Sequence, residues 1–174
     1  DRSFNHIFLT GPDKHEFEDE IKPLNKKETF FIVSSKSFST DETMQSLDFA
    51  RAWIGGELEF KDHFICITSQ IDKAKEFDFD KTTAIQFPNE IGGRYSIWSP
   101  ISLAAILEIG ESFIDFLKGG SLADKNLYSN SNYKQFIKTI IFSDLWHNNF
   151  DNKHTRAVLT YSWKLRYFTD YAQQ

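Results

Sequence analysis

The chain has 174 residues, of which 40% are hydrophobic and 26% charged, a composition typical of one globular domain and unlike that of a disordered segment. Twenty Lys and Arg against twenty-five Asp and Glu give a net charge of −5, which excludes a general electrostatic attraction to nucleic acid or to an anionic membrane surface. No run of about 18 apolar residues occurs, so we expect no membrane-spanning helix. A single cysteine excludes an internal disulfide and is typical of a reducing compartment such as the cytoplasm.

Both ends of the sequence suggest a fragment of a longer chain. It opens at Asp1 without a methionine or a signal-peptide pattern, and it ends at Gln174 directly after an amphipathic stretch. It contains no internal repeat, low-complexity tract or long linker. We therefore expect residues 1–174 to form a single domain.

Short apolar runs alternate with helix-like stretches along the first two-thirds of the chain. Clusters of β-branched and aromatic residues predict strands at residues 6–10, 29–33, 63–68 and 83–87. Helical spacing predicts helices at residues 13–24, 41–54 and 70–76. This alternation predicts βαβ units and a parallel sheet, with helices on both faces because the crossovers are right-handed.

The last third has a different character. It predicts helices at residues 99–109, 111–117, 133–148 and 163–172, and one further strand at residues 156–160. Cys66 falls inside an apolar strand, where we expect a buried, unreactive thiol. Asp144 and His147 have the spacing of two metal ligands on one helix, but no second pair completes a site, so we expect no metal.

A hydroxyl-rich segment at residues 34–43 is the first candidate site. It follows a predicted buried strand and precedes a predicted helix, so it lies at the carboxyl edge of the sheet, where open α/β folds bind ligands. Six Ser and Thr side chains and Lys36 occur within ten residues, and the helix N-terminus adds free N–H donors suited to a phosphate. A structural explanation stays open beside it, because Ser39 and Glu42 also have the spacing of a capping box.

A segment with two consecutive glycines and an arginine, residues 88–100, is the second candidate site and follows the fourth predicted strand. Gly92 and Gly93 permit positive φ angles and a close approach of backbone to a ligand, and Arg94 can direct its planar guanidinium toward an oxyanion. The alternative is a plain turn in which Arg94 forms a salt bridge with Glu90.

Together the two segments resemble the phosphoglucose isomerase family. Ser35-Lys36-Ser37-Phe38-Ser39-Thr40-Asp41-Glu42-Thr43 is similar to that family's Ser-Lys-Thr-Phe-Thr-Thr-x-Glu-Thr segment. Ile91-Gly92-Gly93-Arg94-Tyr95-Ser96-Ile97-Trp98-Ser99 resembles its Val-Gly-Gly-Arg-Tyr-Ser-Leu-Trp-Ser signature, and the final Tyr171-Ala172-Gln173-Gln174 its Tyr-Phe-Gln-Gln. The order and separation of the motifs extend the likeness over essentially the whole chain.

The resemblance implies an α/β fold, a three-layer αβα sandwich with a mostly parallel five-stranded sheet. This is the flavodoxin-like sugar isomerase domain, one of two in the whole enzyme. It further implies isomerisation of glucose 6-phosphate and fructose 6-phosphate through a cis-enediol(ate), without a metal or organic cofactor. The partners it implies are the hexose 6-phosphate and, in the intact enzyme, a second copy in a homodimer, with no nucleic acid or membrane.

Residue roles carried over from the family are also expectations. Arg94 would stabilise the negative charge of the enediolate. The residues expected to bind substrate are Ser35, Lys36, Ser37, Thr40, Thr43, Gly93 and Gln174. The family's catalytic glutamate belongs to a Met-Glu-Ser-Asn-Gly-Lys motif that we expect just past Gln174, so the 174-residue chain alone should not catalyse the reaction. The alternative function is a non-catalytic sugar-phosphate-binding regulatory module, whereas an extracellular cytokine-type protein has little support.

Overall fold

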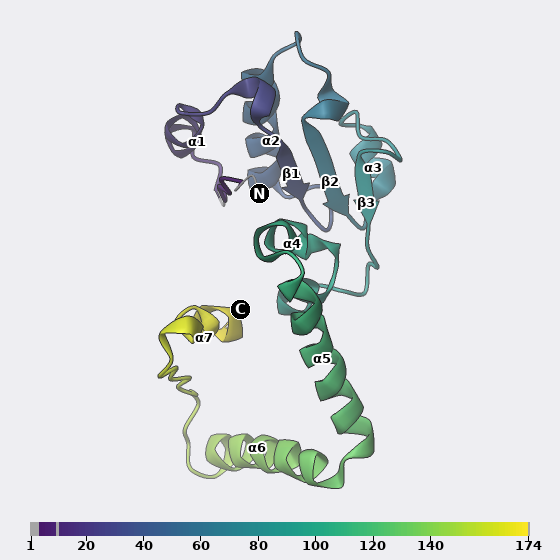
Figure 1. Ribbon diagram of the computed structural model, residues 1–174. Helices are drawn as coiled ribbons and strands as arrows, with labels where there is room; N and C mark the ends of the chain where they lie inside the picture. The colour runs from purple at the N-terminus through teal and green to yellow at the C-terminus, as the bar shows by residue number, and fades with distance from the viewer. Residues whose placement is uncertain (1–3, 10, 174) are drawn as a thin grey trace. The chain divides into compact units, whose positions relative to one another are not determined.

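The computed structural model describes residues 4–9 and 11–173, and the chain divides into two compact units, residues 1–108 and 109–174 (Figure 1). The first unit contains α1 (Lys14–Ile21), η1 (Lys26–Glu28), β1 (Phe31–Ser34), α2 (Asp41–Ile54), η2 (Phe60–Asp62), β2 (Phe64–Thr68), α3 (Ile71–Lys75), β3 (Ala84–Gln86), η3 (Gly93–Trp98) and η4 (Pro100–Ser102). Helix α4 (Leu103–Ile109) lies at the boundary, with its last residue in the second unit. The second unit contains α5 (Ser112–Ser129), α6 (Ser131–Asn149), η5 (Trp163–Leu165) and α7 (Phe168–Gln173).

The sheet of the first unit is parallel, with the strand order β1-β2-β3. Phe31 pairs with Phe64 across the first ladder, and Cys66 pairs with Ala84 across the second. Helix α2 connects β1 to β2, and α3 connects β2 to β3. The predicted α/β class with a parallel sheet is therefore confirmed.

The expected number of five strands is wrong, because the described residues form three. Residues 6–9 are not in a strand, and Thr10 lies outside the described residues. His6 Nδ1 lies beside the Glu108 carboxylate, while Phe8 is 68% exposed. Residues 156–160 also form no strand, and the Arg156 side chain pairs with Asp144 of α6 at 2.8 Å. Apolar composition alone does not make a strand; the backbone also needs a ladder partner.

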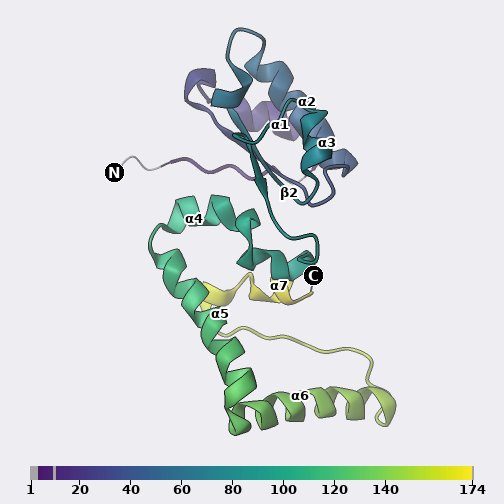
Figure 2. The same cartoon turned by 90° about the vertical axis from the view of Figure 1, so that its right-hand side faces the viewer.

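The core of the first unit lies between the sheet and three helices. Side chains alternate between the two faces of each strand, so Val33, Phe64 and Cys66 face the same way. They pack in one buried cluster with residues of α1, α2 and α3, namely Phe17, Ile21, Leu47, Ala50, Ile54 and Ala74. Figure 2 shows these three helices on one side of β2. The second helical layer of the expected sandwich stays a prediction.

The opposite sheet face is apolar as well. The register places Ile32 beside Ile65 and Ile67 beside Ile85 on that face. Ile67 is fully buried, and the other three are half-buried. The continuous apolar character of these strands, with hydrophobic residues on both faces, is the pattern of a parallel sheet rather than of a solvent-facing one.

Helix α2 forms where the sequence predicts it and positions the candidate site. Leu47, Ala50 and Ile54 are buried at helical spacing, so this face of α2 packs into the core. The helix ends at Gly55, whose φ of 78° suits glycine at a helix C-terminus. Its other end, at Thr40, follows the hydroxyl-rich segment directly.

Cys66 is buried in β2 with no exposed surface, as predicted, and burial raises the pKa of its thiol to about 12. Since the thiolate is the reactive form, we expect alkylation of the native protein at pH 8 to be at least about 100-fold slower than that of the urea-unfolded chain. Timed reaction with iodoacetamide, followed by mass spectrometry, measures both rates. Equal rates would contradict the burial of this residue.

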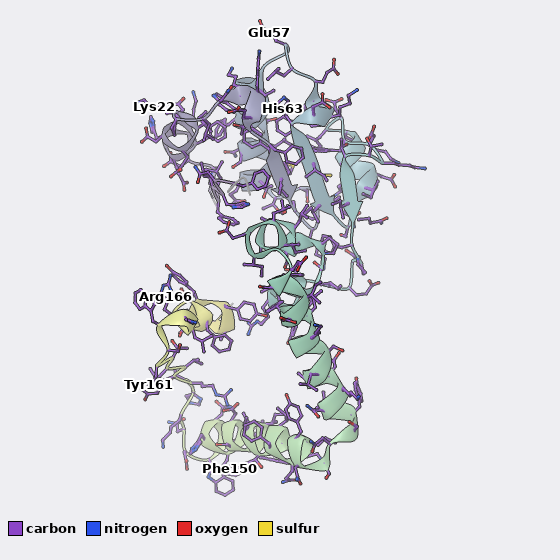
Figure 3. All side chains as sticks on the ribbon, viewed as in Figure 1. Lys22, Glu57, His63, Phe150, Tyr161 and Arg166 are labelled. Atoms are coloured by element: carbon purple, nitrogen blue, oxygen red, sulfur yellow. The ribbon has the colours of Figure 1, made fainter. Side chains whose placement is uncertain are left out.

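The second unit consists mainly of helices, and α5 and α6 are both longer than predicted. Phe150 and Tyr161 extend from the ribbon, with 71% and 96% of their surfaces exposed (Figure 3). The expected final helix is divided into η5 and α7, and the Arg166 guanidinium packs on the rings of Trp163 and Tyr167 at 4.6 and 4.5 Å. Across residues 4–9 and 11–173, no helix combines the length and hydrophobicity needed to cross a membrane.

Candidate functional site

Three loops follow the three parallel strands and therefore leave the sheet at the same edge. The phosphate loop, residues 35–40, joins β1 to α2. The bridging segment, Ser69 and Gln70, joins β2 to α3. The glycine–arginine turn, residues 88–94, follows β3. Glu57 and His63, which precede β2, mark the opposite end of the sheet (Figure 3).

The phosphate loop gathers several hydroxyl groups. Ser35 Oγ lies 3.4 Å from Thr40 Oγ1 and accepts a hydrogen bond from the Phe38 backbone N–H at 3.2 Å. Ser39 Oγ donates to Ser37 Oγ at 3.0 Å. Ser35 is buried, whereas Ser37, Ser39 and Thr40 are exposed. Ser35 therefore organises the loop from inside, and the exposed hydroxyls are accessible to a ligand.

Phe38 anchors this loop to the core. Its φ of 47° is in the left-handed region, which costs a non-glycine residue about 1–2 kcal/mol. Its side chain is 2% exposed and packs edge-on against Phe77 and Phe79, with ring centroids 5.6 Å apart in both cases. Burying a phenylalanine contributes roughly 1.5–3 kcal/mol, which offsets the backbone strain. The ring thus fixes the turn that brings Ser35 and Thr40 together.

The N-terminus of α2 adds backbone donors beside the hydroxyls. Thr40 is the N-cap residue, and its side chain makes no capping hydrogen bond. The capping box considered for Ser39 and Glu42 is therefore wrong, because the helix begins one residue later and Ser39 contacts Ser37 instead. Thr43 lies in the first turn and is half-buried. The free N–H groups of this turn can bind an anion.

Two carboxylates in the first turn of α2 reduce the attraction of this end for an anion. Asp41 and Glu42 are both exposed, and their negative charges offset the positive partial charge at this end of the helix. The cation of the phosphate loop, Lys36, therefore has to supply the charge that the helix end lacks. This makes the position of Lys36 important for what the loop can bind.

The sequence suggested positive φ angles at both glycines of the glycine–arginine turn, and the structure has one at Gly93 only. Gly93 has a φ of 54°, which favours glycine, whereas Gly92 is extended at −165°. Arg94 follows in η3 and is half-buried. Gln174, also expected to bind substrate, lies outside the described residues.

Lys36 joins the two predicted sites. A Cβ atom placed on Gly92 would lie 3.0 Å from Lys36 Nζ, so the lysine extends from the phosphate loop across the glycine. The absence of a side chain at Gly92 makes room for this ammonium group. The structure thus brings Lys36 of one motif beside the turn that carries Gly93 and Arg94 of the other.

Two polar residues at this edge, Ser69 and Asn89, were given no role by the sequence analysis. Ser69 donates to the Lys36 carbonyl oxygen from its backbone N–H at 3.2 Å and from its hydroxyl at 2.8 Å. Thr68 Oγ1 donates to the same oxygen at 3.1 Å. Ser69 Oγ also lies 3.2 Å from Asn89 Oδ1 in the glycine–arginine turn. Their position directly after two predicted strands was a signal that could have identified them.

A hollow lies elsewhere in the first unit. It has a volume of about 670 Å³ and is lined by Leu24, Asn25, Lys26, Lys27, Ile54, Gly55, Gly56, Glu57 and Leu58. These residues precede β1 and β2, so the hollow is at the amino end of the strands, away from all three loops. We place the candidate site at the other edge because the hydroxyls, Lys36 and the glycine–arginine turn meet there.

The metal ligands considered at the start have other partners. Asp144 pairs with Arg156, and His147 Nδ1 lies 2.7 Å from Asp151 Oδ2. Over the part of the chain that the structure describes, no group of three His, Cys, Asp or Glu side chains could hold a metal ion.

Comparison with a solved structure supports the fold. The chain is similar to a hypothetical protein from Thermus thermophilus, with 23% identity and a TM-score of 0.65. The match covers 78% of this chain and 34% of the other, so the present chain spans about a third of the length of that protein. At this level of identity the likeness concerns the fold alone.

Comparison with protein families identifies the relationship. The family model described as phosphoglucose isomerase matches residues 2–174, which include the phosphate loop, the glycine–arginine turn and both structural units. The match covers nearly the full sequence and agrees with the resemblance of the two motifs. The chain therefore belongs to the phosphoglucose isomerase family.

Proposed function

We propose that residues 1–174 form a single sugar isomerase domain of glucose-6-phosphate isomerase, acting on glucose 6-phosphate and fructose 6-phosphate. In this proposal the chain supplies the phosphate-binding loop and the arginine that stabilises the intermediate. The observation that carries it is the approach of Lys36 to Gly92, which brings two family motifs to one edge of the sheet. A hexose phosphate has one anionic end and one reacting end, and it needs two such elements.

The proposed binding step uses the phosphate loop. Ser37 and Thr40 present exposed hydroxyls, Ser35 and Thr43 support them, and the first turn of α2 provides backbone N–H donors. Hydroxyl and backbone donors suit the oxygens of a phosphate monoester, and Lys36 adds a full positive charge. Gly93 presents backbone to the sugar, and Gln174 donates or accepts a hydrogen bond there.

The proposed chemical step is a proton transfer between C2 and C1 of the open-chain sugar. Removal of a proton beside the carbonyl leaves negative charge on the enediolate oxygens, and its return to the neighbouring carbon completes the isomerisation. Arg94 stabilises that charge as it develops, in the manner of an oxyanion hole. The base belongs to the Met-Glu-Ser-Asn-Gly-Lys motif, which is not among these 174 residues.

The proposal places the protein in glycolysis and gluconeogenesis in the cytoplasm, without a cofactor. Its small-molecule partner is the hexose 6-phosphate, and the intact enzyme is a homodimer. The single, buried Cys66 is compatible with a reducing compartment.

Titration of the 174-residue chain tests the binding step. We expect glucose 6-phosphate to bind weakly, with a dissociation constant at least about tenfold below that of glucose, because the phosphate supplies most of the polar contacts. We also expect no turnover of fructose 6-phosphate in an assay coupled to glucose-6-phosphate dehydrogenase. Equal affinity for glucose would contradict the phosphate site, and turnover by the pure chain would contradict the assignment of the base.

A further inference from the structure

We infer that Ser69 is a positioning residue that sets the spacing between the phosphate loop and the glycine–arginine turn, so that one hexose phosphate can contact both. This inference rests on the proposed function. Ser69 belongs to neither motif, yet the hydrogen bonds of its hydroxyl and backbone connect it to residues in both loops.

The first step of the argument concerns the Lys36 carbonyl oxygen. It accepts hydrogen bonds from Ser69 N–H, Ser69 Oγ and Thr68 Oγ1, at 3.2, 2.8 and 3.1 Å. Three donors on one carbonyl hold the backbone of the phosphate loop against the end of β2. Thr68 is fully buried and also accepts from Gln70 N–H at 3.0 Å, so the anchor itself is fixed.

The second step concerns the glycine–arginine turn. Ser69 Oγ lies 3.2 Å from Asn89 Oδ1, three residues before Gly92. The hydroxyl has one proton, so it can donate to Lys36 or to Asn89, not to both at once. With the Asn89 amide rotated by 180°, its NH2 group would donate to Ser69 Oγ, and both contacts would form together. The rotated arrangement ties Asn89 to the same hydroxyl that holds Lys36.

The third step concerns the Lys36 side chain. Its ammonium lies across Gly92, in the turn that also carries Gly93 and Arg94. The position of that charge depends on the Lys36 backbone, which Ser69 holds, and on the turn, which Ser69 contacts through Asn89. When the Ser69 hydroxyl is lost, Ser69 N–H and Thr68 Oγ1 still donate to the Lys36 carbonyl oxygen, so the phosphate loop and its charge stay in place. What is lost is the contact with Asn89, which sets the distance to the glycine–arginine turn.

This difference separates a positioning role from a general structural one. A ligand that uses only the phosphate loop should be insensitive to the spacing, whereas a ligand that spans both loops should not. Inorganic phosphate is the first kind and fructose 6-phosphate the second. The expected result for Ser69→Ala is a five- to tenfold weaker binding of fructose 6-phosphate with binding of inorganic phosphate within twofold of the original.

The test is a pair of NMR titrations of the 174-residue chain with the two ligands. Ser69→Thr retains the hydroxyl and should restore sugar-phosphate binding. Ser46→Ala is the matched control, because Ser46 Oγ also bridges two segments, to the carbonyls of Gly11 and Glu42, away from the site. Asn89 is exposed, and Asn89→Ala removes the other partner of the Ser69–Asn89 contact. We expect an intermediate loss of fructose 6-phosphate binding from this variant, which provides the test if Ser69→Ala does not fold.

The outcomes distinguish the inference from the proposed function. If the original chain binds neither ligand, the proposed function fails and the inference with it. If the original chain binds both, and Ser69→Ala either retains full fructose 6-phosphate binding or loses the two ligands equally, only the positioning role is overturned. Selective loss of fructose 6-phosphate binding, restored by threonine, supports it.

Discussion

Replacing Arg94 with alanine is expected to lower kcat of the intact isomerase about 100–1,000-fold while changing the affinity for a hexose 6-phosphate by less than about fivefold. The reason is that a group aimed at charge which develops in the transition state contributes little to binding the ground state, and removal of one such donor typically costs this much in rate. The measurement combines a coupled assay for kcat with a titration of the non-isomerised substrate analogue 6-phosphogluconate.

Two further arginine variants serve as controls for this prediction. Arg94→Lys retains a positive charge but not the planar fork, so it should recover only part of the rate. Arg166→Ala removes a guanidinium that packs on Trp163 and Tyr167 and should leave kcat within twofold. If Arg94→Ala weakens binding and kcat/KM equally with kcat unchanged, Arg94 is a simple binding group, as the alternative regulatory module requires.

The strands were predictable where both faces of the sheet are apolar. Residues 29–33, 63–68 and 83–87 contain runs of β-branched and aromatic residues, and β1, β2 and β3 form within or next to them. The runs at residues 6–10 and 156–160 have similar composition, but the described residues there form no strand. The difference is the neighbouring strand, which has to supply the backbone hydrogen bonds of a ladder and which the local sequence does not specify.

The sequence predicted which residues belong to the candidate site better than it predicted the contacts between them. The position of the phosphate loop and the glycine–arginine turn after strands followed from the alternation of elements, and parallel order then brought both to one edge. The left-handed backbone of Phe38 and the contact of Lys36 with Gly92 could not be predicted, because both depend on packing between segments distant in sequence. Ser69 could have been noticed because it directly follows a predicted strand, but its hydrogen bonds with Lys36 and Asn89 join segments distant in sequence.

Replacing Ser35 and Thr40 together with alanine is expected to raise the KM of the intact enzyme for fructose 6-phosphate about 10–100-fold, with a change in kcat of less than fivefold. The Thr40 hydroxyl that bonds the charged phosphate contributes about 1.5–3 kcal/mol to binding, and the buried Ser35 hydroxyl holds the loop around it. Both effects act on the ground state and the transition state alike. Steady-state kinetics over a wide substrate range measure both constants. Inorganic phosphate should also inhibit the double variant less strongly.

The loss should be specific to these two hydroxyls. Ser35 Oγ and Thr40 Oγ1 lie 3.4 Å apart, so the double variant empties one local cluster and leaves Lys36 and Arg94 in the chain. Ser46→Ala with Thr82→Ala removes one serine and one threonine hydroxyl from the same unit, outside the three loops, and should leave KM within twofold. An unchanged KM in the Ser35 and Thr40 variant would contradict phosphate binding by this loop. A large fall in kcat alone would indicate that the two hydroxyls act in the chemical step rather than in substrate binding.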